Sequence, residues 1–332
     1  MLAYCLLALF ALQQAPSSSD ASADVTRAIA EARTLIAEGK AREAMAKLQP
    51  LAAGSVAAAH LLGVAYYHAD DHARAIQQLA AVRDKLPEGS ADQREAVQVL
   101  GLSYYLTGRY ADAVPLLEQT RAWARDNLEL GYVLGLAYIH TRKPDAARES
   151  LAQTYRLSAD SAAAHVLAAQ LMLRVEMEAQ AEGELKRALE KDPRVPRANY
   201  LLAQIALFRG RLDEAIALSE RELAINPTDA MALSQLGDAY GRASKNDDAI
   251  AALQKSMWLN PYYSGPYILL GRAYMKKGQP ATAEGMLRRA IQYDPNNRSA
   301  HYMLAQLLQQ TGRVEEAKQE FAIAERLQPP GR

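Results

Sequence analysis

The densest group of side chains that could bind a metal ion is His68-Ala69-Asp70-Asp71-His72, with His60 two helical turns earlier. A metal site would need these imidazole and carboxylate groups to converge on one point. His68 and His72 are four residues apart, but they lie on either side of a turn between two helices, so they do not share a helix face. We therefore predict a polar turn with an acidic helix cap here, and no metal site.

Catalytic patterns are also missing from the sequence. His140, His165 and His301 are isolated, and no serine or cysteine nucleophile pattern lies near them. There is no phosphate-binding glycine loop and no Gly-x-Ser-x-Gly motif. The single cysteine, Cys5, excludes an intramolecular disulfide and a cysteine-based zinc site. The sequence thus predicts a protein that is not an enzyme, with no catalytic residues and no cofactor.

Length and composition limit the fold and the partners. The chain has 332 residues, too many for one ordinary globular core, but a stack of repeats escapes this limit because each repeat packs only on its neighbours. Abundant alanine and leucine favour helix over sheet. Thirty-eight basic residues balance 38 acidic ones, so nucleic acid is not an expected partner.

A fixed period runs through the second half of the chain. Prolines recur every 34 residues, at Pro193, Pro227, Pro261, Pro295 and Pro329. A period of this length is typical of stacked helical repeats. Such an array offers a long surface and seldom a catalytic pocket.

One period, residues 264–297, shows the expected unit of helix, short turn and helix. Gly278 is placed to end the first helix in a left-handed conformation, and Asp294-Pro295 ends the second because a residue before proline avoids helical geometry. The face of the first helix is formed by Tyr267, Leu270, Gly271 and Tyr274, and that of the second by Ala283, Leu287 and Ala290.

These residues resemble the tetratricopeptide repeat family, through Leu-Gly-x-x-Tyr in the first helix, alanine in the second and the closing proline. The resemblance implies an all-α, right-handed superhelical solenoid of about nine helix-turn-helix repeats over residues 24–332. The units are expected near 25–55, 56–89, 94–127, 128–161, 162–195, 196–229, 230–263, 264–297 and 298–331. Two steps depart from 34 residues, and the four extra residues of the longer step fall in a loop around Pro87–Asp92.

Two columns of small residues keep this register in all nine units. Small residues on both helices let the paired backbones approach closely, and a leucine there would overpack the contact. The second-helix column is Ala44, Ala75, Ala113, Ala147, Ala181, Ala215, Ala249, Ala283 and Ala317. The first-helix column is Ala32, Gly63, Gly101, Gly135, Ala169, Ala203, Gly237, Gly271 and Ala305.

Residues 1–23 resemble a secretory signal. Residues 2–12 form an apolar run too short to span a bilayer, and Ala21-Ser22-Ala23 fits a cleavage site, with Ala15 as an earlier option. No Lys or Arg precedes the run, which argues against export. We expect a periplasmic or secreted protein without a membrane span in its mature chain, and a cytoplasmic location stays open as the alternative.

The family resemblance also implies a partner groove along the first helices, at the second, fifth, ninth, twelfth and thirteenth places of each unit. Its N-terminal part is aromatic and aliphatic, and its C-terminal part carries five positive charges against one negative. The candidate groove residues are Tyr67, Tyr105, Tyr132, Arg174, Arg197, Tyr200, Gln204, Arg242, Arg272, Lys276 and Tyr302.

The sequence therefore favours an interaction scaffold that binds a peptide or protein segment. An apolar end of the groove would accept side chains, and a basic end would pair with carboxylates. The alternative is a recruiting subunit of an enzyme complex whose catalytic domain is on another chain. The identity of the protein or peptide partner is not contained in the sequence.

Overall fold

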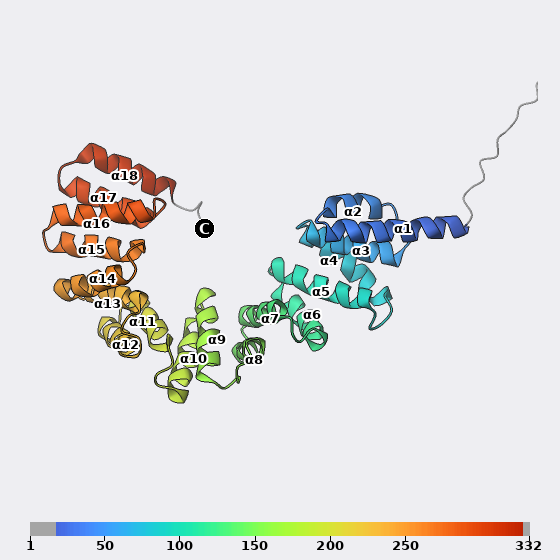
Figure 1. The fold of residues 1–332 in the computed structure, drawn as a ribbon, viewed down its shortest axis with the longest axis horizontal. Coiled ribbons are helices and arrows are strands. Elements are labelled where there is room, and N and C mark those ends of the chain that lie inside the picture. Colours follow the sequence, from blue (N-terminus) through green and yellow to red (C-terminus); the bar gives the residue numbers. More distant parts are fainter. Residues whose placement is uncertain (1–17, 328–332) are drawn as a thin grey trace, which may run out of the picture. The chain divides into compact units, whose positions relative to one another are not determined.

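The computed structural model describes residues 18–327, and every regular element within this range is helical. Eighteen α-helices follow one another as nine pairs, and the two helices of each pair pack together (Figure 1). The chain divides into two compact units, one that ends at Tyr155 and one that begins at Arg156. The all-α repeat solenoid of nine helix pairs predicted from the sequence is confirmed.

The first unit contains four pairs, and α3 contacts both α1 and α5, the first helices of the neighbouring pairs. Its elements are α1 (Ser18–Ala37), α2 (Ala41–Leu48), α3 (Val56–His68), α4 (His72–Val82), the short 3-10 helix η1 (Arg83–Lys85), α5 (Ala91–Leu106), α6 (Tyr110–Trp123), α7 (Leu128–His140) and α8 (Pro144–Thr154).

The second unit contains five pairs, and contacts between first helices recur from α11 to α17. Its helices are α9 (Ala162–Arg174), α10 (Glu178–Lys191), α11 (Ala198–Phe208), α12 (Leu212–Ile225), α13 (Ala230–Arg242), α14 (Asn246–Leu259), α15 (Ser264–Lys276), α16 (Pro280–Tyr293), α17 (Arg298–Gln310) and α18 (Val314–Arg326).

The turn inside every pair contains one residue in the left-handed conformation. Glycine, which adopts positive φ without steric cost, fills this place in five pairs, and Gly278 ends α15 as predicted. Asp70 takes it between α3 and α4, where the side chain of Asp71 accepts a hydrogen bond from the backbone N–H of Arg74 at 3.2 Å. The predicted polar turn with an acidic cap is therefore confirmed.

Each glycine in the first-helix column of small residues meets a leucine sixteen positions later in the chain. A Cβ atom added to any glycine of this column would come within 3.4 Å of that leucine, closer than ordinary van der Waals contact. The two helices of a pair thus approach so closely that the glycine leaves room for one buried leucine. The pairs are Gly63–Leu79, Gly101–Leu117, Gly135–Leu151, Gly237–Leu253 and Gly271–Leu287.

The four-residue insertion is partly helical, which corrects the expectation of a loop around Pro87–Asp92. Helix α5 begins at Ala91 with Ser90 as its cap, because the serine hydroxyl accepts a hydrogen bond from the backbone N–H of Gln93. Asp92 therefore lies in the first turn of a helix, where its negative charge is favourable.

The predicted apolar run and the cleavage option at Ala15 lie outside the described residues. Ala21–Ala23, the other predicted cleavage site, falls within α1. Among the described helices, none combines the length and the apolar character that crossing a membrane requires.

Candidate functional site

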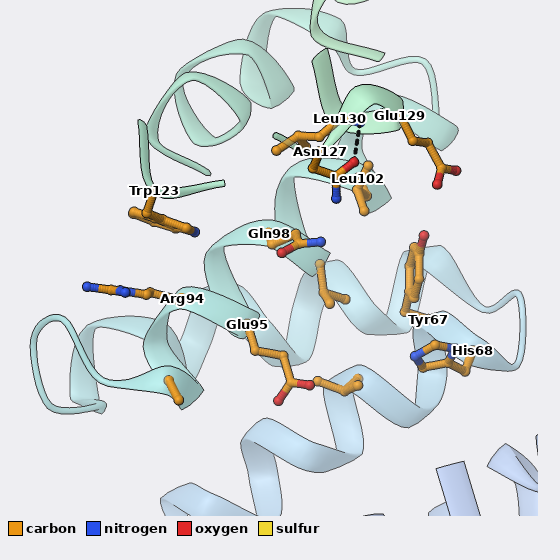
Figure 2. A pocket seen from close by; sticks show the side chains of 13 residues that line it. Tyr67, His68, Arg94, Glu95, Gln98, Leu102, Trp123, Asn127, Glu129 and Leu130 are labelled. Carbon is orange, nitrogen blue, oxygen red and sulfur yellow. Dashed lines mark hydrogen bonds between the residues drawn. The ribbon is translucent and has the colours of Figure 1, made fainter. Parts of the chain in front are cut away.

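The first unit contains a cavity of about 680 Å³, here called the first-unit cavity. Tyr67 from α3, Leu102 from α5 and Trp123 at the end of α6 stand around it (Figure 2). It is lined by Val64, Tyr67, His68, Ala91, Arg94, Glu95, Gln98, Val99, Leu102, Trp123, Asn127, Glu129 and Leu130.

Local contacts hold several of these side chains in place. The guanidinium of Arg94 lies over the Trp123 ring at 5.7 Å, a cation–π arrangement. The Asn127 side chain caps α7 by accepting a hydrogen bond from the Leu130 N–H at 2.9 Å. Burial raises the pKa of the Tyr67 hydroxyl, so this phenol stays protonated at neutral pH. The cavity thus combines aromatic and aliphatic walls with a few fixed polar groups, as small binding clefts do.

At the margin of this cavity, the structure brings together three side chains that could hold a metal ion. They are His60 of α3 with Asp92 and Glu95 of α5. Burial lowers the pKa of the His60 imidazole, while the nearby Glu95 carboxylate acts in the opposite direction. This group was not predicted, because the sequence places His60 near the 68–72 segment and does not show that its side chain meets Asp92 and Glu95 of α5.

The second unit contains a cavity of about 470 Å³, here called the second-unit cavity. Three arginines and one aspartate supply its charges, and Tyr263 and Tyr302 stand among them. It is lined by Ser234, Asp238, Arg242, Tyr263, Gly265, Ile268, Leu269, Arg272, Asn297, Arg298, Ser299, Tyr302 and Met303.

Asp238 is shared by two of the three arginines. Its Oδ2 atom lies 2.8 Å from Nη2 of Arg242, and its Oδ1 atom lies 2.7 Å from Nη2 of Arg272. The third arginine, Arg298, forms no ion pair with any described residue. The basic wall counted from the sequence is therefore partly neutralised from within, and an excess positive charge remains at the Arg298 side.

A smaller cavity of about 210 Å³ brings together four more of the predicted residues: Arg174, Arg197, Tyr200 and Gln204. The Arg197 guanidinium lies 4.2 Å from the Tyr200 ring centre. Burial raises the pKa of the Tyr200 hydroxyl, which the Arg197 charge opposes.

The remaining predicted residues lie outside these cavities, and all eleven are at least partly exposed. Tyr105 contacts the Tyr110 ring at 5.5 Å, and Lys276 donates a hydrogen bond from Nζ to the Gly241 carbonyl at 2.6 Å. Tyr132 is half-buried in α7. Their contact with a partner stays a prediction.

Several cavity residues were absent from the prediction. Tyr263 is the last residue of repeat 230–263 and Arg298 is the first residue of repeat 298–331, and the family contact pattern includes neither place. Trp123 stands at the end of a second helix, whereas the prediction took first helices alone.

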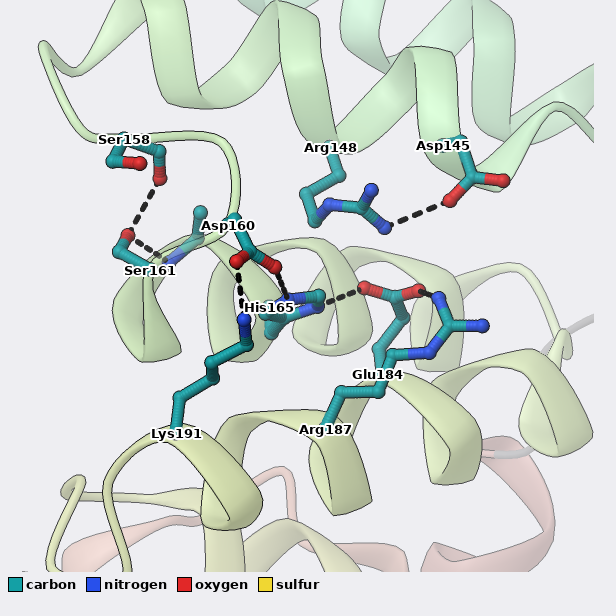
Figure 3. A network of polar contacts seen from close by, with 10 residues as sticks. Asp145, Arg148, Ser158, Asp160, Ser161, His165, Glu184, Arg187 and Lys191 are labelled. Carbon is teal, nitrogen blue, oxygen red and sulfur yellow. Dashed lines mark hydrogen bonds and ion pairs between the residues drawn. The ribbon is translucent and has the colours of Figure 1, made fainter.

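A polar network surrounds the buried His165 in the second unit (Figure 3). His165 Nδ1 lies 2.6 Å from Oε2 of Glu184, and its Nε2 lies 3.5 Å from Oδ1 of Asp160. The Ser161 hydroxyl caps α9 and donates to the Ser158 carbonyl at 2.7 Å, so it is not directed at the imidazole. His165 therefore stands between two carboxylates, an arrangement without a nucleophile for it to activate.

The same arrangement recurs four repeats later. His301 Nδ1 lies 2.6 Å from Oε2 of Glu320, again nineteen residues along the chain, as His165 is from Glu184. The Nε2 atom of His301 lies 3.0 Å from the Pro295 carbonyl. Recurrence at one place of the repeat indicates that these pairs join the two helices of a unit.

Comparisons with known proteins identify the family of the chain. A family model described as "Tetratricopeptide repeat" matches residues 104–171 and 277–330, and a second with that description matches residues 179–230. Together they cover more than half of the chain. No curated protein matches the chain.

Among solved structures, one titled "Crystal structure of MamA" is 24% identical, covering 46% of this chain and 91% of its own, with a TM-score of 0.42. A thermophilic TPR protein in Thermus thermophilus is 22% identical, covering 51% of this chain and 92% of its own, with a TM-score of 0.46. The APC/C hetero-tetramer Cut9–Hcn1 is 15% identical, covering 85% of this chain and 55% of the matched one, with a TM-score of 0.48.

Proposed function

The chain belongs to the tetratricopeptide repeat family, and we propose that it is a non-enzymatic scaffold that binds an extended segment of a partner protein. Repeat arrays expose long surfaces that suit extended partners. Both units contain open cavities bordered by first helices, and each cavity joins aromatic or aliphatic walls with a few polar groups.

We further propose that the second-unit cavity takes an acidic side chain of that segment. The observation that carries this is the set of three guanidiniums from Arg242, Arg272 and Arg298, against the single carboxylate of Asp238. A partner carboxylate would meet the excess positive charge, since guanidinium forks bind carboxylates through paired hydrogen bonds. Tyr263 and Tyr302, both exposed, would contact apolar residues beside it.

The test is selection of a random peptide library, displayed on phage, against the full chain. Selected peptides are expected to contain Asp or Glu next to an aromatic or aliphatic residue. Arg298→Glu is expected to weaken binding of a selected peptide about 10-fold, because it places a like charge against the peptide carboxylate. Arg242 and Arg272 are poorer targets, because reversing either would set a carboxylate against Asp238.

Lys255→Glu is the matched control, since it makes the same charge change at an exposed position of α14, outside the cavity. Affinity measured by fluorescence polarisation should stay within about 2-fold of wild type for this variant. Selected peptides without acidic residues, or equal effects of the two variants, would reject the assignment.

Export remains a separate proposal, supported by the apolar run at residues 2–12 and the Ala21-Ser22-Ala23 sequence. We expect the protein isolated from its native source to lack residues 1–23 or 1–15. Intact-mass spectrometry measures this directly. A native chain that begins at Met1 and fractionates with the cytosol would contradict export.

A further inference from the structure

His60 is a fully buried histidine with unusual surroundings. Its side chain is 0% exposed, and neither ring nitrogen has a hydrogen-bond partner among the described residues. Burying a polar group without a hydrogen bond is costly, so such groups usually have a partner that satisfies them. An acidic group stands close to Nε2, with Oε2 of Glu95 at 3.3 Å.

We propose that His60, Asp92 and Glu95 form a binding site for a divalent transition-metal ion, with Zn²⁺ as its typical occupant. One ligand atom from each residue lies within 4.8 Å of the other two. Zinc bonds to imidazole nitrogen and carboxylate oxygen at about 2.0–2.2 Å, so modest rotation of the two carboxylate side chains would complete the contacts. Both carboxylates are partly exposed, at 40% and 35%, which leaves the metal a path from solvent.

The donor set favours zinc over magnesium or calcium. Imidazole nitrogen suits zinc and its transition-metal neighbours, whereas magnesium and calcium prefer sites made of oxygen. Three protein ligands also leave one coordination position open, to a water or to a group from a bound partner. Glu95 lines the first-unit cavity as well, so that open position would lie at its margin (Figure 2).

The guanidinium of Arg33 already lies beside the two carboxylates of the proposed site. Arg33 of α1 places Nη2 2.8 Å from Oδ1 of Asp92 and Nη1 3.3 Å from Oε2 of Glu95. The Arg33 side chain is 48% exposed, so it can turn into solvent when a metal ion binds. Arg33 is thus a competitor that occupies the carboxylates without satisfying the ring nitrogens of His60.

The site depends on the one insertion in the repeat array. Asp92 lies in the extra turn at the start of α5, and without it the carboxylates facing His60 would be reduced to Glu95. The fifth place of the unit, where His60 stands, holds no other histidine in the following units. Both features distinguish the repeat that begins at Val56 from the following repeats of the array.

The experiment is calorimetric titration of the full chain with Zn²⁺ in a buffer that does not bind metal. We expect one tight site, not displaced by Mg²⁺. Asp92→Asn and Glu95→Gln should each weaken zinc binding at least about 10-fold, as loss of metal-site groups typically does. Arg33→Gln should strengthen it about 3- to 10-fold, because it removes two partly exposed ion pairs that compete with the metal.

Two further measurements separate this site from an ion-pair cluster of purely structural importance. Asp160→Asn, which changes a carboxylate beside His165, should leave zinc affinity within about 2-fold of wild type. Zinc should shift the ring NMR signals of one of the six histidines. Absence of zinc binding, unchanged affinity in the Asp92 and Glu95 variants, or weaker binding after Arg33→Gln would each overturn the proposal.

Discussion

Replacing Gly237 by leucine is expected to lower the free energy of unfolding by about 3 kcal/mol. A Cβ atom at this position would lie 2.4 Å from Cγ of Leu253, which is buried at 1% exposure. The longer side chain therefore cannot enter the contact unless α13 and α14 separate. Urea unfolding followed by circular dichroism measures the loss, and hydrogen exchange should show it concentrated in this helix pair.

Gly285→Leu is the matched control. Gly285 is exposed on α16, and a Cβ built on it would meet no described atom within 4 Å. Leucine is a better helix former than glycine by about 0.8 kcal/mol, so this variant should be slightly more stable than wild type. A similar loss in both variants would show that close packing between α13 and α14 is not the reason for Gly237.

Replacing Glu222 by alanine is expected to cost about 3 kcal/mol as well, because a helix loses its cap. The Glu222 side chain is buried on α12, and its two oxygens accept hydrogen bonds from the backbone N–H groups of Arg197 at 2.7 Å and Tyr200 at 3.2 Å. These N–H groups open α11 and have no partner of their own within the helix. Alanine would leave both part-buried donors without this acceptor.

Glu222 caps α11 because this repeat lacks the usual capping residue. The residue before the first helix caps it in neighbouring units, as Ser161 and Asp229 do, but the corresponding residue here is Val195. Val195 is apolar and buried, and Arg197 enters α11 in a left-handed conformation with φ of 75°. Glu222 supplies the missing acceptor from the second helix of the same unit, and so fixes the backbone that carries Arg197 and Tyr200.

Denaturant unfolding of three variants tests this role. Glu222→Gln keeps the shape but only one acceptor oxygen, so it should lose about half as much stability as Glu222→Ala. Glu214→Ala, on the exposed face of α12 with a surface pair to Arg211, should lose less than about 1 kcal/mol. If Glu222→Ala were no worse than Glu214→Ala, the capping role would be wrong.

The fold could be predicted because its signals are local. A helix end depends on a few adjacent residues, so Gly278 and Asp294-Pro295 mark the ends of α15 and α16 in the sequence and in the structure. The conformation of the insertion was harder to predict, because a few residues there decide between helix and loop. Ser90 decides the outcome by capping α5, which moves Ala91 and Asp92 from the predicted loop into the helix.

The cavities were less predictable. The family contact pattern indicates which side chains share a helix face, but it does not indicate which groups of other helices they contact. Arg242 and Arg272 were counted among the positive charges of the groove, and the structure pairs both with Asp238. Arg298 and Tyr263 fall between the contact places of the pattern, although they line the same cavity.

The sequence by itself determined the class of fold, the register of the repeats and the absence of familiar catalytic motifs, since all three are written in residue type and spacing. Only the tertiary structure decided which distant groups meet: Glu222 with the start of α11, and His60 with Asp92 and Glu95. Each contact joins residues of two different helices, and these residues do not belong to one periodic face. The Glu222 carboxylate is held by two hydrogen bonds to the start of α11, and the His60 ring is buried beside Glu95, which no local pattern encodes.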